Sequence, residues 1–348
     1  MRIVMMGTGS FAEPTFLALA QSRHEVVALV TNPDRPAGKE REMVRPIKKL
    51  AVERGIPVFQ PESVNSPEGV AGVRSFRPDL LVVAAYGQIL SAEVLESAPR
   101  GGINVHASLL PKYRGAAPVE WAIYHGETQT GVTIIRMSTK LDAGEMLAQE
   151  AVDILPDETA GELEARLAQV GARLAVEVVE RLAAGEVRGI VQDPRLVTKA
   201  PKLKKEHGLI DWTRPAHLVC CQIRAMQPWP TAYTFLHQEG KPPLRLIVLK
   251  ARPEALRPRL GGTEGLRPRL GDTEALRPRL PDTEGLRPPL GAPGVVVGVD
   301  DEGILVAAGE GWVRPLIVQP AGKRPMTIAE FLRGHPVRVG DRFGPESP

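Results

Sequence analysis

Apolar and polar stretches alternate along the first half of the chain as expected for strands followed by helices. Residues 2–6 are apolar and precede a helical segment that ends near Ser22, and residues 25–31 form a second apolar run. Residues 79–84 are almost wholly apolar, as in a central strand that is buried on both faces. This alternation predicts a mostly parallel sheet with helices on both faces.

The second half begins with a long helical pattern. Large apolar residues recur at three- and four-residue spacing up to Leu182, and Gly185 ends the pattern. After a helix near residues 215–226, short apolar runs separated by turns predict a small β-barrel of the oligonucleotide-binding type. These runs cover residues 232–236, 244–250, 294–299, 304–308 and 313–318.

The chain therefore divides into two predicted domains. Residues 1–185 are expected to form a Rossmann-like α/β domain, and residues 207–348 the oligonucleotide-binding-type barrel. The polar and basic stretch at residues 186–206 is expected to be a linker between them.

Residues 251–293 contain a ten-residue repeat. Units of the form Leu-Arg-Pro-Arg-Leu-x-x-Thr-Glu-x begin at Leu256, Leu266, Leu276 and Leu286. A proline in each unit and only two large apolar residues leave little to bury, so we expect an extended insertion between two barrel strands.

The composition favours a protein of a reducing compartment. Of 348 residues 43% are hydrophobic, which is ample for a core, and the two cysteines, Cys220 and Cys221, are adjacent and too close for an unstrained disulfide. The opening strand reaches Gly7 too soon for a signal peptide, and no stretch approaches the ~20 apolar residues of a membrane span. We expect a cytoplasmic protein.

The charge is divided unevenly between the halves. Residues 1–190 carry a net charge of −4 and residues 191–348 carry +7. The second half is the better surface for a polyanion, although a balance of this size is often only a solvated surface.

The candidate catalytic residues lie around residues 102–106, which are predicted to form a short strand. Because side chains alternate faces along a strand, Asn104 and His106 share one face. Pro111 then ends strand pairing, and the end of a strand is where α/β sheets bind ligands. An amide donor beside a histidine suits an oxyanion that forms on a carbonyl under attack.

Asp142 follows another apolar run and is expected at the same sheet edge, where it can support a protonated His106 and relay a proton. A hydrogen-bonded structural pair is the alternative for Asn104 and His106. Ser108 lacks the frame of a serine nucleophile, which favours direct transfer. Residues 7–9 read Gly-Thr-Gly, but no acidic residue ends the second strand, which disfavours a dinucleotide site.

A longer motif carries a resemblance to a known family. Residues 104–118 read Asn-x-His-x-Ser-Leu-Leu-Pro-x-Tyr-Arg-Gly-x-x-Pro, which resembles the signature of the 10-formyltetrahydrofolate-dependent formyltransferases. Further segments that resemble this family are residues 32–39, 86–90, 210–212, 224–230 and 319–323. Only residues 251–293 have no counterpart.

The resemblance implies a site and a reaction. Asn104, His106 and Asp142 match the family's catalytic trio. The residues that match its folate-contacting segments are Ser108, Leu109, Leu110, Pro111, Gln88, Ile89 and Leu90. The formyl donor is expected to be 10-formyltetrahydrofolate, without a metal, and the acceptor to be the α-amine of methionine on initiator tRNA.

Other acceptors and other classes remain as alternatives. A formyltransferase acting on an amino-sugar nucleotide and a hydrolase of the same folate resemble the chain in the catalytic run. A nucleotide-binding oxidoreductase or a plain RNA-binding module would leave the trio without chemistry. The expected enzyme is a monomer.

The resemblance also implies that a loop at residues 33–49 reaches the acceptor end of the tRNA. The candidates for tRNA contact are Arg35, Lys39, Arg41, Lys204 and Lys205. A solvated loop is the alternative, because Glu40 and Glu42 dilute its charge.

Replacing both Lys39 and Arg41 with alanine should raise the KM for charged tRNA, because two phosphate contacts are lost. It should also flatten the dependence of binding on salt, since fewer counterions are released. A salt titration of tRNA binding measures this, and an unchanged slope would remove the loop from the interface.

Deleting most of residues 251–293 and rejoining the flanking strands with a short glycine-containing turn should leave folding nearly unaffected. Closure entropy changes by only about 0.6 kcal/mol per doubling of loop length. We expect activity on charged tRNA within a few-fold of that of the full chain, and first proteolytic cuts of the intact protein within the repeats. If the deletion weakens tRNA binding about ten-fold at unchanged Tm, the repeat arginines form an RNA contact.

Overall fold

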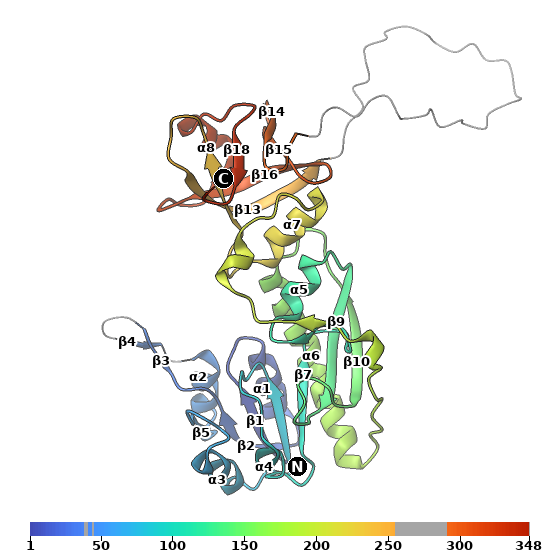
Figure 1. Ribbon diagram of the computed structural model, residues 1–348. Helices are drawn as coiled ribbons and strands as arrows, with labels where there is room; N and C mark the ends of the chain where they lie inside the picture. Colours follow the sequence, from blue (N-terminus) through green and yellow to red (C-terminus); the bar gives the residue numbers. More distant parts are fainter. Residues whose placement is uncertain (38–40, 44, 255–290, 348) are drawn as a thin grey trace, which may run out of the picture. The chain divides into compact units, whose positions relative to one another are not determined.

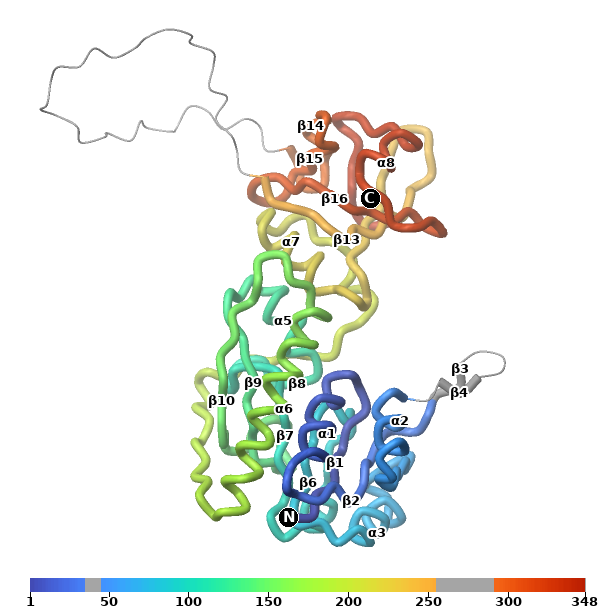
Figure 2. The backbone as a smooth tube through the Cα atoms, turned by 180° about the vertical axis from the view of Figure 1, so that it is seen from behind, coloured from blue at the N-terminus to red at the C-terminus, as the bar shows by residue number. Residues whose placement is uncertain are grey.

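The computed structural model describes residues 1–37, 41–43, 45–254 and 291–347, with the backbone alone at 35–37 and 41–43. The chain forms two compact units, drawn in Figures 1 and 2. The first comprises Met1–Gly208 with Arg224–Thr231, and the second Leu209–Ile223 with Ala232–Pro348. Each is described by itself.

A seven-stranded sheet forms the centre of the described first unit, in the order β10-β9-β7-β6-β1-β2-β5. Its strands are β1 (Arg2–Gly7), β2 (Glu25–Val30), β5 (Val58–Phe59), β6 (Leu80–Ala84), β7 (Gly102–His106), β9 (Gln129–Arg136) and β10 (Met146–Asp153). The strands from β5 to β7 pair in parallel, whereas β9 is antiparallel to both β7 and β10. The predicted mostly parallel, Rossmann-like sheet is confirmed.

Helices cover the sheet because alternate strand residues are apolar on both faces. The helices are α1 (Ala12–Gln21), α2 (Pro46–Glu53), α3 (Pro67–Ser75), α4 (Ala92–Leu95), α5 (Pro118–Tyr124) and α6 (Ala160–Ala184). Val4, Met6 and Val83 pack with residues of α3 and α4 in one buried cluster. Helices α1 and α6 lie side by side, and α6 contacts β7, β9 and β10 (Figure 2).

Helix α6 packs closely against strand β7. A capping box between Thr159 and Glu162 begins the helix, and Gly185, with a φ of 78°, ends it as the sequence predicted. A Cβ atom at Gly171 would lie 2.7 Å from Cγ1 of Val105, so glycine is needed where α6 approaches β7. Val105 therefore faces the helix, while Asn104 and His106 occupy the alternate positions of the strand.

The stretch at residues 186–206 is not the separate linker that its polar composition predicted. In the structure it belongs to the first unit, where β11 (Lys199–Ala200) pairs in parallel with β8 (Arg114–Gly115). It also contains the 3₁₀ turns Pro194–Leu196 and Lys205–Gly208. Backbone pairing with distant residues leaves no local sequence signal, which explains the error.

The second unit is a curled antiparallel sheet, as expected for a small barrel domain. Its strands are β12 (Tyr233–His237), β13 (Leu244–Glu254), β14 (Val296–Asp300), β15 (Gly303–Ala307), β16 (Trp312–Pro320), β17 (Met326–Thr327) and β18 (Arg342–Gly344). Strands β14 and β18 stand at the two ends of the strand order, and a bridge between Val295 and Arg342 joins these ends. Irregular pairing near Lys250 helps to curl β13 against β16.

Among the described residues of this unit, the helices are α7 (Ala216–Ala225) and α8 (Ile328–Gly334). Sequence reasoning predicted α7 and the five longer strands but missed β17, β18 and α8. Residues 255–290, which hold the repeats, lie outside the described residues. Among helices of the described ranges, none has the length and apolar character needed to cross a membrane.

Candidate active site

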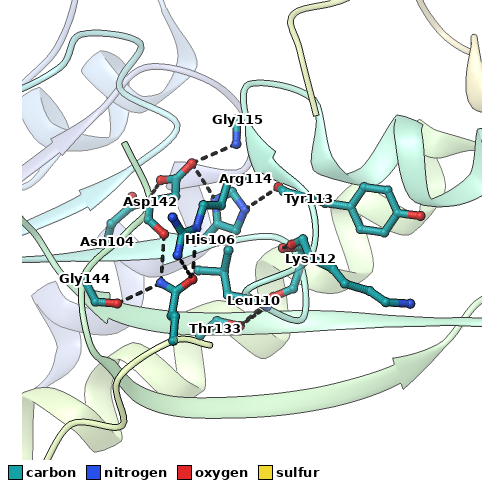
Figure 3. Close-up of polar contacts among 12 residues, drawn as sticks. Asn104, His106, Leu110, Lys112, Tyr113, Arg114, Gly115, Thr133, Asp142 and Gly144 are labelled. Carbon is teal, nitrogen blue, oxygen red and sulfur yellow. Dashed lines mark hydrogen bonds and ion pairs between the residues drawn. The ribbon is translucent and has the colours of Figure 1, made fainter. Parts of the chain in front are cut away.

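Asn104 and His106 lie close together at the carboxyl end of strand β7 (Figure 3). The side chain of His106 is 5% exposed. Its Nε2 lies 3.0 Å from the carbonyl oxygen of Tyr113. A carbonyl oxygen can only accept a hydrogen bond, so this contact places a proton on Nε2 and turns Nδ1 toward Asp142.

Asp142 completes the predicted trio. Its Oδ2 lies 3.7 Å from Nδ1 of His106, and its Oδ1 accepts a hydrogen bond of 3.5 Å from Nδ2 of Asn104. The backbone N–H of Gly115 donates a shorter bond, 2.9 Å, to Oδ2. The structure thus brings together three side chains that the sequence placed at one sheet edge.

The turn that carries Asp142 has an unusual backbone. Asp142 has a φ of 48°, in the left-handed region that aspartate tolerates better than bulky residues. Two residues later, a Cβ atom at Gly144 would lie 1.7 Å from the carbonyl oxygen of Arg136, so the turn has no room for a side chain there. The carboxylate is therefore held by a closely packed turn.

Gln192 fixes this turn from the stretch that was predicted to be a linker. Its Nε2 donates hydrogen bonds of 2.8 Å to the carbonyl oxygens of Asp142 and Gly144. Its Oε1 accepts two bonds from the guanidinium of Arg114, at 3.0 and 2.7 Å. Gln192 is 5% exposed, and no sequence motif marked it.

A cavity of about 550 Å³ opens beside the trio. It is lined by the segments that follow β6 and β7, by the turn of Asp142, and by residues of α5 and α6. Its volume falls in the range of small-molecule sites, roughly 300–1,000 Å³. Asn104, His106 and Asp142 all line it.

The predicted folate-contacting residues fall into two groups. Gln88, Ile89 and Leu90 line the cavity, and the Gln88 side chain is itself held by Asn32 and by the backbone N–H of Val64. Residues 108–111 do not line it.

Residues 108–111 instead support the end of β7. Oγ of Ser108 donates to the carbonyl of Lys112, and the backbone N–H of Leu110 donates to Thr133. Gln149 donates to the carbonyl of Leu110. Folate contact by Ser108, Leu109, Leu110 and Pro111 therefore stays a prediction, while the structure gives Ser108 and Leu110 a role in shaping the turn.

Two further carboxyl groups line the cavity, Glu120 of α5 and Glu164 of α6. Burial, aided by the nearby charge of Glu164, raises the pKa of Glu120 to about 7. Burial also raises the pKa of Glu164. Sequence reasoning did not single out either residue.

The predicted tRNA contacts lie outside this cavity. Lys204 and Lys205 are exposed, and Lys204 pairs with Glu206 at 3.5 Å. The backbone of Arg35 belongs to β3 (Arg35–Ala37) and that of Arg41 to β4 (Arg41–Met43). Lys39 lies outside the described residues.

Two other cations of that loop have structural partners. Arg45 donates to the carbonyl oxygens of Asn32 and Pro33. Lys48 forms an ion pair with Asp34. These contacts fix the end of the loop at helix α2.

Comparisons with known proteins match both units of the chain. A family model described as formyl transferase matches residues 1–179, and one described as formyl transferase, C-terminal domain, matches residues 202–336. The chain is 42% identical to a methionyl-tRNA formyltransferase of Geobacter sulfurreducens, over 99% of this chain and 97% of the relative. It is 40% identical to that of Moorella thermoacetica, over 99% of each.

Solved structures share the fold at much lower identity. An N-formyltransferase from Helicobacter canadensis, crystallised with folinic acid and dTDP-3-aminofucose, matches with a TM-score of 0.59 at 14% identity, over 91% of this chain and 98% of that one. HypX from Aquifex aeolicus matches with a TM-score of 0.56 at 18% identity, over 95% of this chain and 48% of that one. These likenesses concern the fold alone.

Replacing Gly144 with alanine should destabilise the first unit, because the added methyl group would collide with the backbone of Arg136 and force the turn to move. Overpacking of this kind costs about 1–3 kcal/mol. We expect a lower Tm and a shifted NMR signal of the His106 ring. Gly9→Ala is the matched control, since its methyl group would meet Ala85 at an ordinary 3.9 Å. Equal Tm values for the two variants would contradict the packing of this turn.

Proposed function

The chain belongs to the formyl transferase family, and we propose that it transfers a formyl group from 10-formyltetrahydrofolate to the α-amine of methionine carried by initiator tRNA, for translation initiation. The observation that carries this proposal is the 42% identity to a methionyl-tRNA formyltransferase along nearly the whole of both chains. Such coverage includes the cavity and the second unit alike.

The cavity fits the proposed formyl donor. Its volume of about 550 Å³ suits a pterin-sized group, and Ile89, Leu90 and Met137 give it apolar walls. The trio lies in the same wall, where it can reach a formyl carbon held in the cavity. Folate-bound members of the same fold, such as HypX with tetrahydrofolic acid, accord with this choice of donor.

The reaction follows from the trio's geometry. The neutral amine attacks the formyl carbon, and the carbonyl oxygen becomes an oxyanion. The amide of Asn104 donates a hydrogen bond to that oxygen, and a protonated His106 donates a second one from Nδ1, because its Nε2 is held by the carbonyl of Tyr113. Asp142 supports the His106 imidazolium from 3.7 Å and carries a proton toward the folate nitrogen that leaves.

The tRNA is proposed to contact the basic candidates of the sequence. Lys204 and Lys205 are exposed and can approach phosphates. Arg35, Lys39 and Arg41 are proposed on the resemblance alone. The same proposal includes a cytoplasmic location and action as a monomer.

A competition between acceptors tests the function. The purified chain is incubated with labelled 10-formyltetrahydrofolate and, in separate reactions, charged initiator tRNA, an amino-sugar nucleotide or water alone. Transfer that requires the charged tRNA supports the proposal. Faster transfer to the amino-sugar nucleotide, or release of formate at the same rate without an acceptor, would assign one of the two alternative activities.

Replacing Asn104 or His106 with alanine should lower kcat by about two to three orders of magnitude, because each loses one oxyanion donor. Asp142→Asn should also be slow, since an amide cannot carry the proton. Steady-state transfer to charged tRNA measures all three, and His217→Ala on the exposed side of α7 serves as a histidine control. Near-normal turnover in all three variants would place the chemistry elsewhere.

A further inference from the structure

Helices α5 and α6 add two carboxyl groups to the wall that holds the trio. The titratable side chains that line this cavity are Tyr86, His106, Glu120, Lys140, Asp142 and Glu164. Within the described residues, Asp142 has His106 as its partner, whereas neither Glu120 nor Glu164 has an ion-pair partner. The Glu120 carboxyl hydrogen-bonds to its own backbone N–H.

Glu164 is the other charged residue that acts on the pKa of Glu120. Glu164 also lines a neighbouring cavity of about 620 Å³ between α1 and α6. That cavity contains Glu13 and Arg173, and the Arg173 guanidinium is already paired with Glu150 and Glu177. Lys140, which also lines the first cavity, is exposed.

Formyl transfer to an amine requires two proton movements. The acceptor arrives mainly as an ammonium ion with three N–H protons and ends as an amide with one. One of the two lost protons ends on the folate nitrogen that leaves, and the other is released to solvent. Asp142, hydrogen-bonded beside the oxyanion donors, carries the proton that ends on the folate nitrogen. The proton that is released to solvent still needs a residue to accept it from the amine.

Building on the proposed function, we propose that Glu120 is a further catalytic residue, whose carboxylate accepts the proton that the methionyl ammonium loses before attack. The N–H bond of the ammonium breaks, its electron pair stays on nitrogen, and the proton passes to a carboxylate oxygen of Glu120. That nitrogen pair then forms the new bond to the formyl carbon. Glu120 returns its proton to solvent after the product leaves.

The position and the basicity of Glu120 both suit this role. It lines the same cavity as Asn104 and His106, which is where the formyl carbon and the attacking amine are proposed to meet. An ordinary carboxylate is too weak a base for an α-amine, whose pKa is about 7.7–8.0. Burial, aided by the charge of Glu164, raises the pKa of Glu120 to about 7. The pKa values of the carboxyl group and the amine are then close, so proton transfer between them costs little free energy.

The first experiment compares variants at the two carboxyl groups. Glu120→Gln should lower kcat at pH 7 by about 10²–10⁴-fold, and Glu120→Asp should restore part of the loss. Glu120→Ala should be rescued by added acetate, because the small carboxylate can occupy the space left by the side chain. Glu177→Gln, on the exposed side of α6, should leave kcat unchanged.

The pH profile of kcat separates a base from a structural residue. In the unmodified chain kcat should rise through about pH 7, and this rise should be absent from Glu120→Gln. Glu164→Gln should keep most of its activity but shift the rise to lower pH, because the charge that raises the Glu120 pKa is removed. A Glu120→Gln variant within three-fold of the unmodified chain, or a loss with an unchanged profile and no acetate rescue, would overturn the proposal.

Thermal unfolding gives a readout independent of formyl transfer. Because the folded-state pKa of Glu120 is raised from 4.5 to about 7, its contribution to stability is fully present below pH 4.5 and is lost as the pH rises through 7. The Tm of Glu120→Gln should therefore fall less between pH 5 and pH 8 than the Tm of the unmodified chain.

The failure of this proposal can be told apart from the failure of the proposed function. If the unmodified chain transfers no formyl group to charged tRNA, the proposed function is wrong. If the unmodified chain transfers it normally and Glu120→Gln is fully active, only the role of Glu120 as a base is wrong.

Discussion

The burial of the Asp142 carboxylate is the constraint on which the site depends. The side chain is only 9% exposed, and a buried charge without partners costs several kcal/mol. The N–H of Gly115, Nδ2 of Asn104 and the ring of His106 surround it, from segments on either side of Pro111. The fold of residues 102–115 can be understood as the means of assembling these donors around one anion.

Carboxyl groups in one cavity have opposite electrostatic surroundings. Asp142 accepts hydrogen bonds from the amide of Asn104 and the backbone N–H of Gly115. Burial and the nearby carboxylate of Glu164 favour the neutral form of Glu120. Carboxyl groups in different surroundings can divide the proton transfers of one reaction between them.

The trio could be predicted from the sequence because the patterns that indicate it involve only neighbouring residues. The period of two along β7 put Asn104 and His106 on one face, and the run before Asp142 was correctly read as the neighbouring strand β9. The spacing of apolar residues likewise predicted α6 to its last turn. Each of these inferences needs only a few consecutive residues.

The remaining features depend on contacts between distant parts of the chain. Gln192 reaches Asp142 across 50 residues, and a polar residue in a polar stretch gave no indication of this. Glu120 and Glu164 meet only because α5 packs against α6. The short strands β17 and β18 are defined by their pairing with β16 and β12 rather than by their own composition.

The contacts of residues 192–200 have a consequence for biosynthesis. Strand β7 and the turn of Asp142 leave the ribosome well before Gln192, and β11, which pairs with β8, follows later still. A nascent chain that has reached the end of α6 has all three members of the trio but lacks the amide that fixes their turn. The order of synthesis therefore places completion of the site after the chain has extended past Ala200.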